Sequence, residues 1–244
     1  MRRTLAPALL FTMMLATVAQ GESVNVAVAA NFTAVAEELA PIFKAATGHE
    51  VIYSFGATGQ LYAQIAQGAP FEIFLSADAA RPAQGVLEGF GVKDSVFTYA
   101  IGSLALYSIS LDLADGKAAL ETGDFDRVAI ADPVTAPYGR AAQQAIEALA
   151  LTAAIAPKLV IGQNITQTLQ FIESGNAELG FVAASQVAGK SGVWIVPADL
   201  HEPIRQDAVL LRAGQANPAA GAFLDFLKSE AAVAVIEAAG YIVE

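Results

Sequence analysis

Four short segments of small, amide-bearing and hydroxyl-bearing residues are the parts of this sequence best suited to binding a ligand. Each segment follows a run of β-forming residues and precedes a helical pattern. The first N–H groups of a helix have no partner within it and lie at the positive end of its dipole, so each junction could hold an anion. The segments are Ala29-Ala30-Asn31, Gly56-Ala57-Thr58-Gly59, Ala136-Pro137-Tyr138-Gly139 and Gln163-Asn164-Ile165-Thr166.

Side chains at these junctions could add donors to the backbone groups. Asn31, Thr58 and Tyr138 carry N–H or O–H groups, whereas Ile165 can offer only its backbone N–H. Taken singly, each junction has a structural alternative, because Asn and Thr commonly cap helices and Gly56 can serve a tight turn. Four such junctions in one chain favour an anion site.

Residues for enzymatic chemistry are scarce by comparison. The chain has no cysteine, and His49 and His201 have no partners at metal-ligand spacing. The sequence contains no G-x-S-x-G, P-loop or G-x-G-x-x-G motif. We therefore expect a binding protein that is not an enzyme and has no cofactor and no metal site of its own. The alternative is an exported hydrolase with Asp78 or Glu72 as the base, although Asp78 fits better as a cap after a strand.

The N-terminus has the three parts of a secretory signal. Arg2 and Arg3 provide positive charge, residues 5–18 form an apolar run, and small residues follow around 19–21. We predict a cleaved signal peptide over residues 1–21 and an exported mature protein. An uncleaved N-terminal anchor is the alternative, but the run is short for a membrane span.

The mature chain is expected to be strongly acidic. The formal charge of the 244 residues is −11, and loss of Arg2 and Arg3 leaves 11 basic against 24 acidic residues, or −13. Such a chain is a poor partner for nucleic acid or for anionic membranes. An anionic ligand would have to be held by local geometry, because long-range attraction would not help.

From residue 23 onward, short β-like runs alternate with helical patterns, as in βαβ units on a mainly parallel sheet. For example, Val35, Leu39 and Phe43 share one helical face, and Gly48 follows at the position of a helix stop. The expected strands are 24–30, 51–55, 73–76, 98–108, 127–131, 159–161, 179–183 and 207–212. The expected helices are 33–47, 60–67, one opening at 81–82, 139–150, 166–174, 218–228 and 230–239.

The chain has no internal repeat and no linker-like tract. We predict an α/β fold of two lobes, each a mainly parallel sheet flanked by helices, joined by two extended crossover segments at 98–108 and 203–212. Lobe 1 would comprise residues 22–100 and 209–244, and lobe 2 residues 101–208. The alternative is one larger doubly wound domain. The protein is expected to act as a monomer.

Eight stretches give the chain a specific resemblance to a known family. They are AANF (29–32), SFGATGQ (54–60), QGAPF (67–71), FLSAD (74–78), FTYAIG (97–102), APYG (136–139), NAELGFV (176–182) and AAGY (238–241). Over essentially its full length, the mature chain resembles the periplasmic molybdate-binding proteins of molybdate ABC transporters. The family fold has two lobes that close on a hinge around a tetrahedral oxyanion, held by neutral donors without a salt bridge.

The resemblance also implies a ligand set and a partner. The implied contacts are Asn31, Thr58, Tyr138 and the main chain of Ile165, with Ala30 and Ala57 as backbone neighbours. The implied ligand is molybdate or tungstate, delivered to the membrane permease of an ABC transporter. Some members have a hydroxyl residue in place of Ala30 and a Tyr in place of Ala183. Here Asn31 and Tyr138 resemble the branch that uses the Tyr of the Pro-Tyr-Gly turn.

Neutral donors would select among oxyanions by protonation and by size. They offer no acceptor to the O–H of hydrogen phosphate, which disfavours that ion. Sulfate has the charge of molybdate, so only the lengths of the hydrogen bonds would separate the two. A receptor for sulfate or another oxyanion is therefore the nearest alternative, and a structural or sensory module with the same fold is a further one. Molybdate and tungstate are too similar in size for the sequence to rank them.

Overall fold

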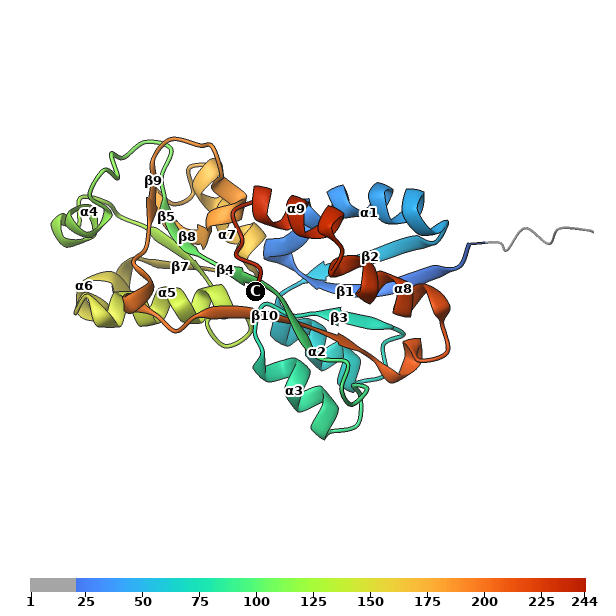
Figure 1. Cartoon of the computed structure of the whole chain (residues 1–244). Helices are drawn as coiled ribbons and strands as arrows, with labels where there is room; N and C mark the ends of the chain where they lie inside the picture. The colour runs from blue at the N-terminus through green and yellow to red at the C-terminus, as the bar shows by residue number, and fades with distance from the viewer. Residues whose placement is uncertain (1–20) are drawn as a thin grey trace, which may run out of the picture.

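The alternating pattern folds into two α/β lobes, as Figure 1 shows for the computed structural model, which describes residues 21–244. One lobe contains the N-terminal part and the C-terminal helices, drawn in blue, cyan and red, and the other contains the middle of the chain. The fold class predicted from the sequence is confirmed. Of the expected signal peptide, residues 1–20 lie outside the described residues.

The first sheet is built on the N-terminal βαβ units. β1 pairs in parallel with β2 and β3, whereas β10 is antiparallel to β3 and β4, so four of its five strands run one way. In spatial order the strands are β2 (Glu50–Gly56), β1 (Ser23–Ala29), β3 (Ile73–Leu75), β10 (Ile204–Leu210) and β4 (Phe97–Gly102). The helices of this lobe are α1 (Thr33–Thr47), α2 (Thr58–Ala66), α3 (Ala80–Leu87), α8 (Pro218–Leu227) and α9 (Glu230–Ala238).

The second sheet repeats this arrangement. β6 pairs in parallel with β7 and β8, and β5 is antiparallel to β8 and β9. In spatial order the strands are β7 (Leu159–Gly162), β6 (Val128–Ala131), β8 (Leu179–Ala183), β5 (Leu104–Tyr107) and β9 (Val193–Ile195). The helices of this lobe are α4 (Gly116–Thr122), α5 (Pro137–Ala148), α6 (Thr152–Ile155) and α7 (Ile165–Glu173). Short 3-10 helices are η1 (Ala30–Phe32), η2 (Ala156–Lys158), η3 (Ala184–Val187), η4 (Ala198–Leu200) and η5 (Arg212–Gly214).

The chain passes between the sheets on extended segments. β4 lies in the first sheet and β5 in the second, with only Ser103 between them, and the chain returns from β9 to β10. The run 98–108, expected as one strand, is therefore two strands in different sheets. The lobe boundaries predicted above, 22–100 with 209–244 and 101–208, stay a prediction.

Helix and strand ends otherwise lie close to the expected ones, and Gly48 ends α1 with φ 77°. The sequence reading missed α4, α6 and β9, which are only seven, four and three residues long. Segments this short show too little periodicity to be recognised. No helix within residues 21–244 is long and apolar enough to cross a membrane.

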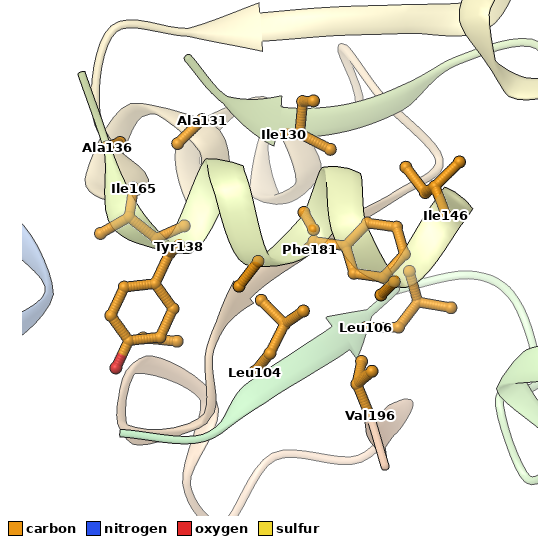
Figure 2. Packing of buried hydrophobic residues seen from close by; sticks show 14 of the residues in the cluster. Leu104, Leu106, Ile130, Ala131, Ala136, Tyr138, Ile146, Ile165, Phe181 and Val196 are labelled. Atoms are coloured by element: carbon orange, nitrogen blue, oxygen red, sulfur yellow. The ribbon is translucent and has the colours of Figure 1, made fainter. Parts of the chain in front are cut away.

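The core of the second lobe reaches the boundary between the lobes. Leu104, Leu106 and Phe181 lie within this buried cluster, and Figure 2 shows Tyr138 and Ile165 at one edge of it. Alanines from the first lobe belong to the same cluster, namely Ala29, Ala30, Ala57 and Ala77. The strand ends of the two lobes are therefore packed against each other.

α5 packs so closely on the end of β6 that position 139 has no room for a side chain, because a Cβ on Gly139 would lie 2.1 Å from the Ala131 carbonyl oxygen. We predict that Gly139→Ala lowers the free energy of unfolding by about 1–3 kcal/mol, since the backbone must shift. The matched control is Gly221→Ala in α8, where no atom beyond the neighbouring helix backbone lies within 4 Å of the added Cβ. That substitution should stabilise by about 0.5–1 kcal/mol. Urea unfolding measures both, and equal effects would contradict the packing described here.

Candidate functional site

The ends of strands and helices from both lobes enclose a small cavity. Its volume is about 10 Å³, close to the space that one water molecule needs. The cavity is lined by Ala29, Ala30, Asn31, Gly56, Ala57, Thr58, Ala77, Ala136, Pro137, Tyr138 and Ile165. All six residues predicted to contact a ligand are in this set, so the structure brings them together. Their roles in binding stay a prediction.

Four helical N-termini meet at this cavity. The first lobe supplies η1, which leads into α1, and α2, while the second lobe supplies α5 and α7. They follow the carboxyl ends of β1, β2, β6 and β7, where ligands bind in open α/β sheets. The positive ends of their dipoles and their unpaired first-turn N–H groups are therefore concentrated at one point.

Three of these N-termini have no side-chain cap. Ala29 precedes η1, Ala57 precedes α2 and Ala136 precedes α5, and none can make a capping hydrogen bond. Alanine at this position costs about 1 kcal/mol relative to Ser, Asp or Asn. The first-turn N–H groups at the cavity have no side-chain acceptor of their own, although the Gly59 N–H is used by the Thr135 carbonyl and Pro137 has no N–H.

Elsewhere in the described chain three helices are capped by side chains, whereas the N-cap residues Ala79 of α3 and Leu151 of α6 make no capping hydrogen bond. Asp115, Asn217 and Ser229 accept hydrogen bonds from the first turns of α4, α8 and α9, all away from the cavity. At the cavity, α7 is capped by Asn164, whose Oδ1 accepts from the Gln167 N–H, but the lining residue Ile165 precedes that bond. Uncapped N-termini are therefore not confined to the cavity, but three of the four that meet there are uncapped.

Thr58 is placed to donate a hydrogen bond. The residue is buried at the start of α2, and its Oγ1 accepts the Ala77 N–H at 3.1 Å. A hydroxyl that already accepts keeps its hydrogen for another partner. Thr58 can therefore offer both this hydroxyl and its backbone N–H to the cavity.

Tyr138 is also buried, and its hydroxyl points away from the apolar cluster in Figure 2. Gln206 Nε2 donates to this hydroxyl at 3.4 Å. A Cβ on Gly102 would lie 2.0 Å from the same oxygen, so the end of β4 must carry glycine here. Burial, and then the neighbouring Tyr241 and Tyr99, raises the pKa of Tyr138 well above its usual value. Tyr138 therefore stays protonated and able to donate.

The side chain of Asn31 differs from the expected free donor. Its Nδ2 donates to Gln206 Oε1 at 2.8 Å and to the Tyr241 hydroxyl at 3.0 Å, which uses both amide hydrogens. The donor that Asn31 retains for a ligand is its backbone N–H. Gln206 and Tyr241 were not identified as site residues from the sequence, because they are 175 and 210 positions away from Asn31.

The cavity is electrically neutral, because none of its lining residues carries a charge. Arg81 lies nearby but forms an ion pair with Asp78, which also accepts the Arg81 backbone N–H at 2.9 Å. Glu72 accepts hydrogen bonds from Asn25 and Asn217. The two carboxylates considered as hydrolase bases thus have structural partners. Among residues 21–244, no group of three or more His, Cys, Asp or Glu could hold a metal.

Direct contacts join the lobes around the cavity. The Gly59 N–H donates to the Thr135 carbonyl at 2.8 Å, and Arg81 Nη2 donates to the Val134 carbonyl at 3.1 Å. Thr166 Oγ1 of the second lobe lies 3.3 Å from the Ala30 carbonyl of the first. These bonds describe a closed arrangement of the lobes.

A larger groove of about 450 Å³ lies beside the cavity and shares Ala77 and Pro137 with it. The groove differs in chemistry, because Asp78, Glu202, Arg140 and Arg205 contribute charges of both signs. None of the residues predicted to contact a ligand lines it.

Comparison with protein families assigns the chain to one of them. Residues 24–242 match the profile described as bacterial extracellular solute-binding protein. The chain is 51% identical over 241 residues to the molybdate-binding protein ModA of Rhodobacter capsulatus, covering 98% of this chain and 96% of that protein. It is 52% identical over 235 residues to ModA of Azotobacter vinelandii, with 93% of each covered.

Solved structures agree with this assignment. The Azotobacter vinelandii periplasmic molybdate-binding protein superposes with a TM-score of 0.87 at 37% identity, covering 91% of this chain and 99% of that one. The sulfate-binding protein SubI from Mycobacterium tuberculosis superposes with a TM-score of 0.74 at 16% identity, covering 90% of this chain and 86% of that one. At that identity the second likeness concerns the fold alone.

The buried tyrosines predict an alkaline limit to stability. Burial is the main cause that raises the pKa of Tyr99, Tyr138 and Tyr241, while unfolded tyrosine ionises near pH 10. Their contribution to stability is therefore complete below about pH 10 and is lost as the pH rises towards the folded-state pKa. Each residue should lower the free energy of unfolding by up to about 1.4 kcal/mol per pH unit in that range.

Urea unfolding from pH 8 to pH 11 measures this loss. Tyr138→Phe should reduce the slope above pH 10 and leave the slope between pH 8 and pH 9 unchanged. An identical slope above pH 10 in the wild type and the variant would show that Tyr138 ionises normally in the fold.

Proposed function

Because the chain belongs to the bacterial extracellular solute-binding proteins, with molybdate-binding proteins as its relatives at 51–52% identity, we propose that it captures molybdate between its lobes and delivers it to an ABC transporter permease. The observation that carries the proposal is the cavity where uncapped helix N-termini of both lobes meet. Tungstate, with the same shape and charge, is proposed as a second ligand.

The site chemistry supports a fully deprotonated oxyanion. The backbone N–H groups and the hydroxyls of Thr58 and Tyr138 all donate, so a protonated ligand would find no acceptor for its own hydrogen. Hydrogen bonds to a charged group are stronger than those to a neutral one, and the buried site strengthens them further. A dianion can therefore be held without a lysine or arginine.

Size is the proposed basis for rejecting sulfate. Sulfate has the same charge as molybdate but shorter bonds from the central atom to oxygen. Donors fixed at the molybdate distance would leave sulfate with stretched hydrogen bonds, which weaken quickly. A sulfate receptor is the alternative within this class. Titration with sulfate and with molybdate distinguishes a sulfate receptor from a molybdate receptor.

The proposed cycle uses only binding and lobe movement. The ligand binds between open lobes, and closure forms the contacts from Gly59 and Arg81 to the opposite lobe. The closed form is the one that the permease receives. The protein acts as a periplasmic monomer after cleavage of its signal peptide, needs no cofactor, does not bind nucleic acid and catalyses no reaction.

Isothermal titration of residues 22–244 with molybdate, tungstate, sulfate and phosphate tests the function. We expect tight 1:1 binding of molybdate and tungstate, and no measurable binding of phosphate or of sulfate at micromolar concentration. Molybdate at about 1,000 times its dissociation constant should also stabilise the fold by about 4 kcal/mol in a melting experiment. Tight binding of sulfate would show that the proposed ligand is wrong. No binding of any of the four anions would refute the proposed function.

A charge placed at one uncapped N-terminus should block the site. Ala57→Asp puts a carboxylate at the N-cap of α2, where it competes for the N–H groups and repels the ligand. Two unit charges about 4 Å apart near a protein surface repel by about 4 kcal/mol, so the molybdate affinity should fall at least a hundredfold. The matched control is Ala57→Asn, which has nearly the same shape without the charge and should lose much less. Equal losses in the two variants would place the anion elsewhere.

A further inference from the structure

The end of the chain lies along both crossover strands. Ile242 and Ile101 exchange two backbone hydrogen bonds of 2.8 and 3.0 Å, which join the C-terminal segment to β4. The Glu244 carboxylate receives two bonds from Arg205 of β10, at 3.1 and 2.8 Å. Figure 1 shows the C-terminus at this junction between the lobes. Tyr241 is therefore held at the hinge from its C-terminal side.

The Tyr241 hydroxyl contacts both lobes behind the cavity. It accepts from Asn31 Nδ2 at 3.0 Å and donates to the Asn31 carbonyl at 3.0 Å, so it holds both polar ends of that residue. Ser185 Oγ, in η3 of the second lobe, donates to the same hydroxyl at 2.9 Å. The Tyr241 ring is buried and packs edge-on against Phe32 with 5.5 Å between ring centroids.

The Tyr241 hydroxyl uses all of its donor and acceptor positions. A tyrosine hydroxyl has one hydrogen to donate and two positions to accept. Asn31 and Ser185 fill the acceptor positions of Tyr241, and the Asn31 carbonyl takes its hydrogen. The nearby Tyr138 hydroxyl accepts from Gln206, and this bond does not use its own hydrogen.

We propose that Tyr241 is a positioning residue for the oxyanion site. It fixes Asn31, and with it the backbone N–H groups of the first loop, and it ties this loop to the second lobe through Ser185 when the lobes close. The inference rests on the proposed function. It assigns to the C-terminal segment a part in ligand affinity, although no atom of Tyr241 lines the cavity.

The test is molybdate binding by Tyr241→Phe, which removes the hydroxyl and keeps the ring against Phe32. Loss of hydrogen bonds that order the site should weaken molybdate at least about tenfold, mainly through faster release. Ser185→Ala, which removes only the bond from Ser185 to the Tyr241 hydroxyl, should show a smaller loss in the same direction. The matched control is Tyr53→Phe, because the buried Tyr53 hydroxyl has no hydrogen-bond partner within the described residues. It should bind as the wild type does.

Amide exchange without ligand separates positioning from a general loss of structure. In Tyr241→Phe, exchange should increase in residues 29–33 and 184–187, with the sheets protected as in Tyr53→Phe. Unchanged molybdate affinity in Tyr241→Phe would overturn the inference and leave the proposed function standing. If Tyr241→Phe does not fold, unchanged release from Ser185→Ala overturns it instead. A wild type that binds none of the oxyanions refutes the proposed function, and the inference fails with it.

Discussion

The proposed function imposes one constraint on the structure, which is that a doubly charged anion has to be held between the lobes without a counter-charge. Desolvating such an ion is costly unless hydrogen-bond donors replace its water. Helix N-termini supply these donors as fixed parts of the backbone, and two come from each lobe. In the proposed function the complete donor set exists only when the lobes are closed, so ligand binding and closure are a single event.

This constraint accounts for features that stability alone would oppose. Alanine is a poor N-cap, yet Ala57 and Ala136 occupy that position where α2 and α5 face the cavity. Gly102 has no side chain because the Tyr138 hydroxyl fills that space. The net charge of −11 is compatible with the proposed anion binding, because no acidic residue lines the cavity.

Much of this arrangement could be read from the sequence, because it depends on local patterns. The βαβ alternation predicted the two lobes, and small residues at strand-to-helix junctions located the four N-termini that meet at the cavity. The residues behind the cavity, which hydrogen-bond to the site residues, could not be predicted in this way. Asn31 fits either a cap or a ligand contact, and its actual partners, Gln206 and Tyr241, come from distant parts of the chain. α4, α6 and β9 were missed because their short segments take their form from neighbouring elements.

The most direct test of the central claim is a crystal structure of the mature protein grown with molybdate, with the molybdenum located by its anomalous scattering. We predict a peak in the cavity between the four helix N-termini, with Thr58, Tyr138 and first-turn N–H groups about 2.7–3.2 Å from the oxyanion oxygens. We also predict no lysine or arginine in contact with the ligand. A peak in the neighbouring groove, bound by Arg140 or Arg205, would contradict the account.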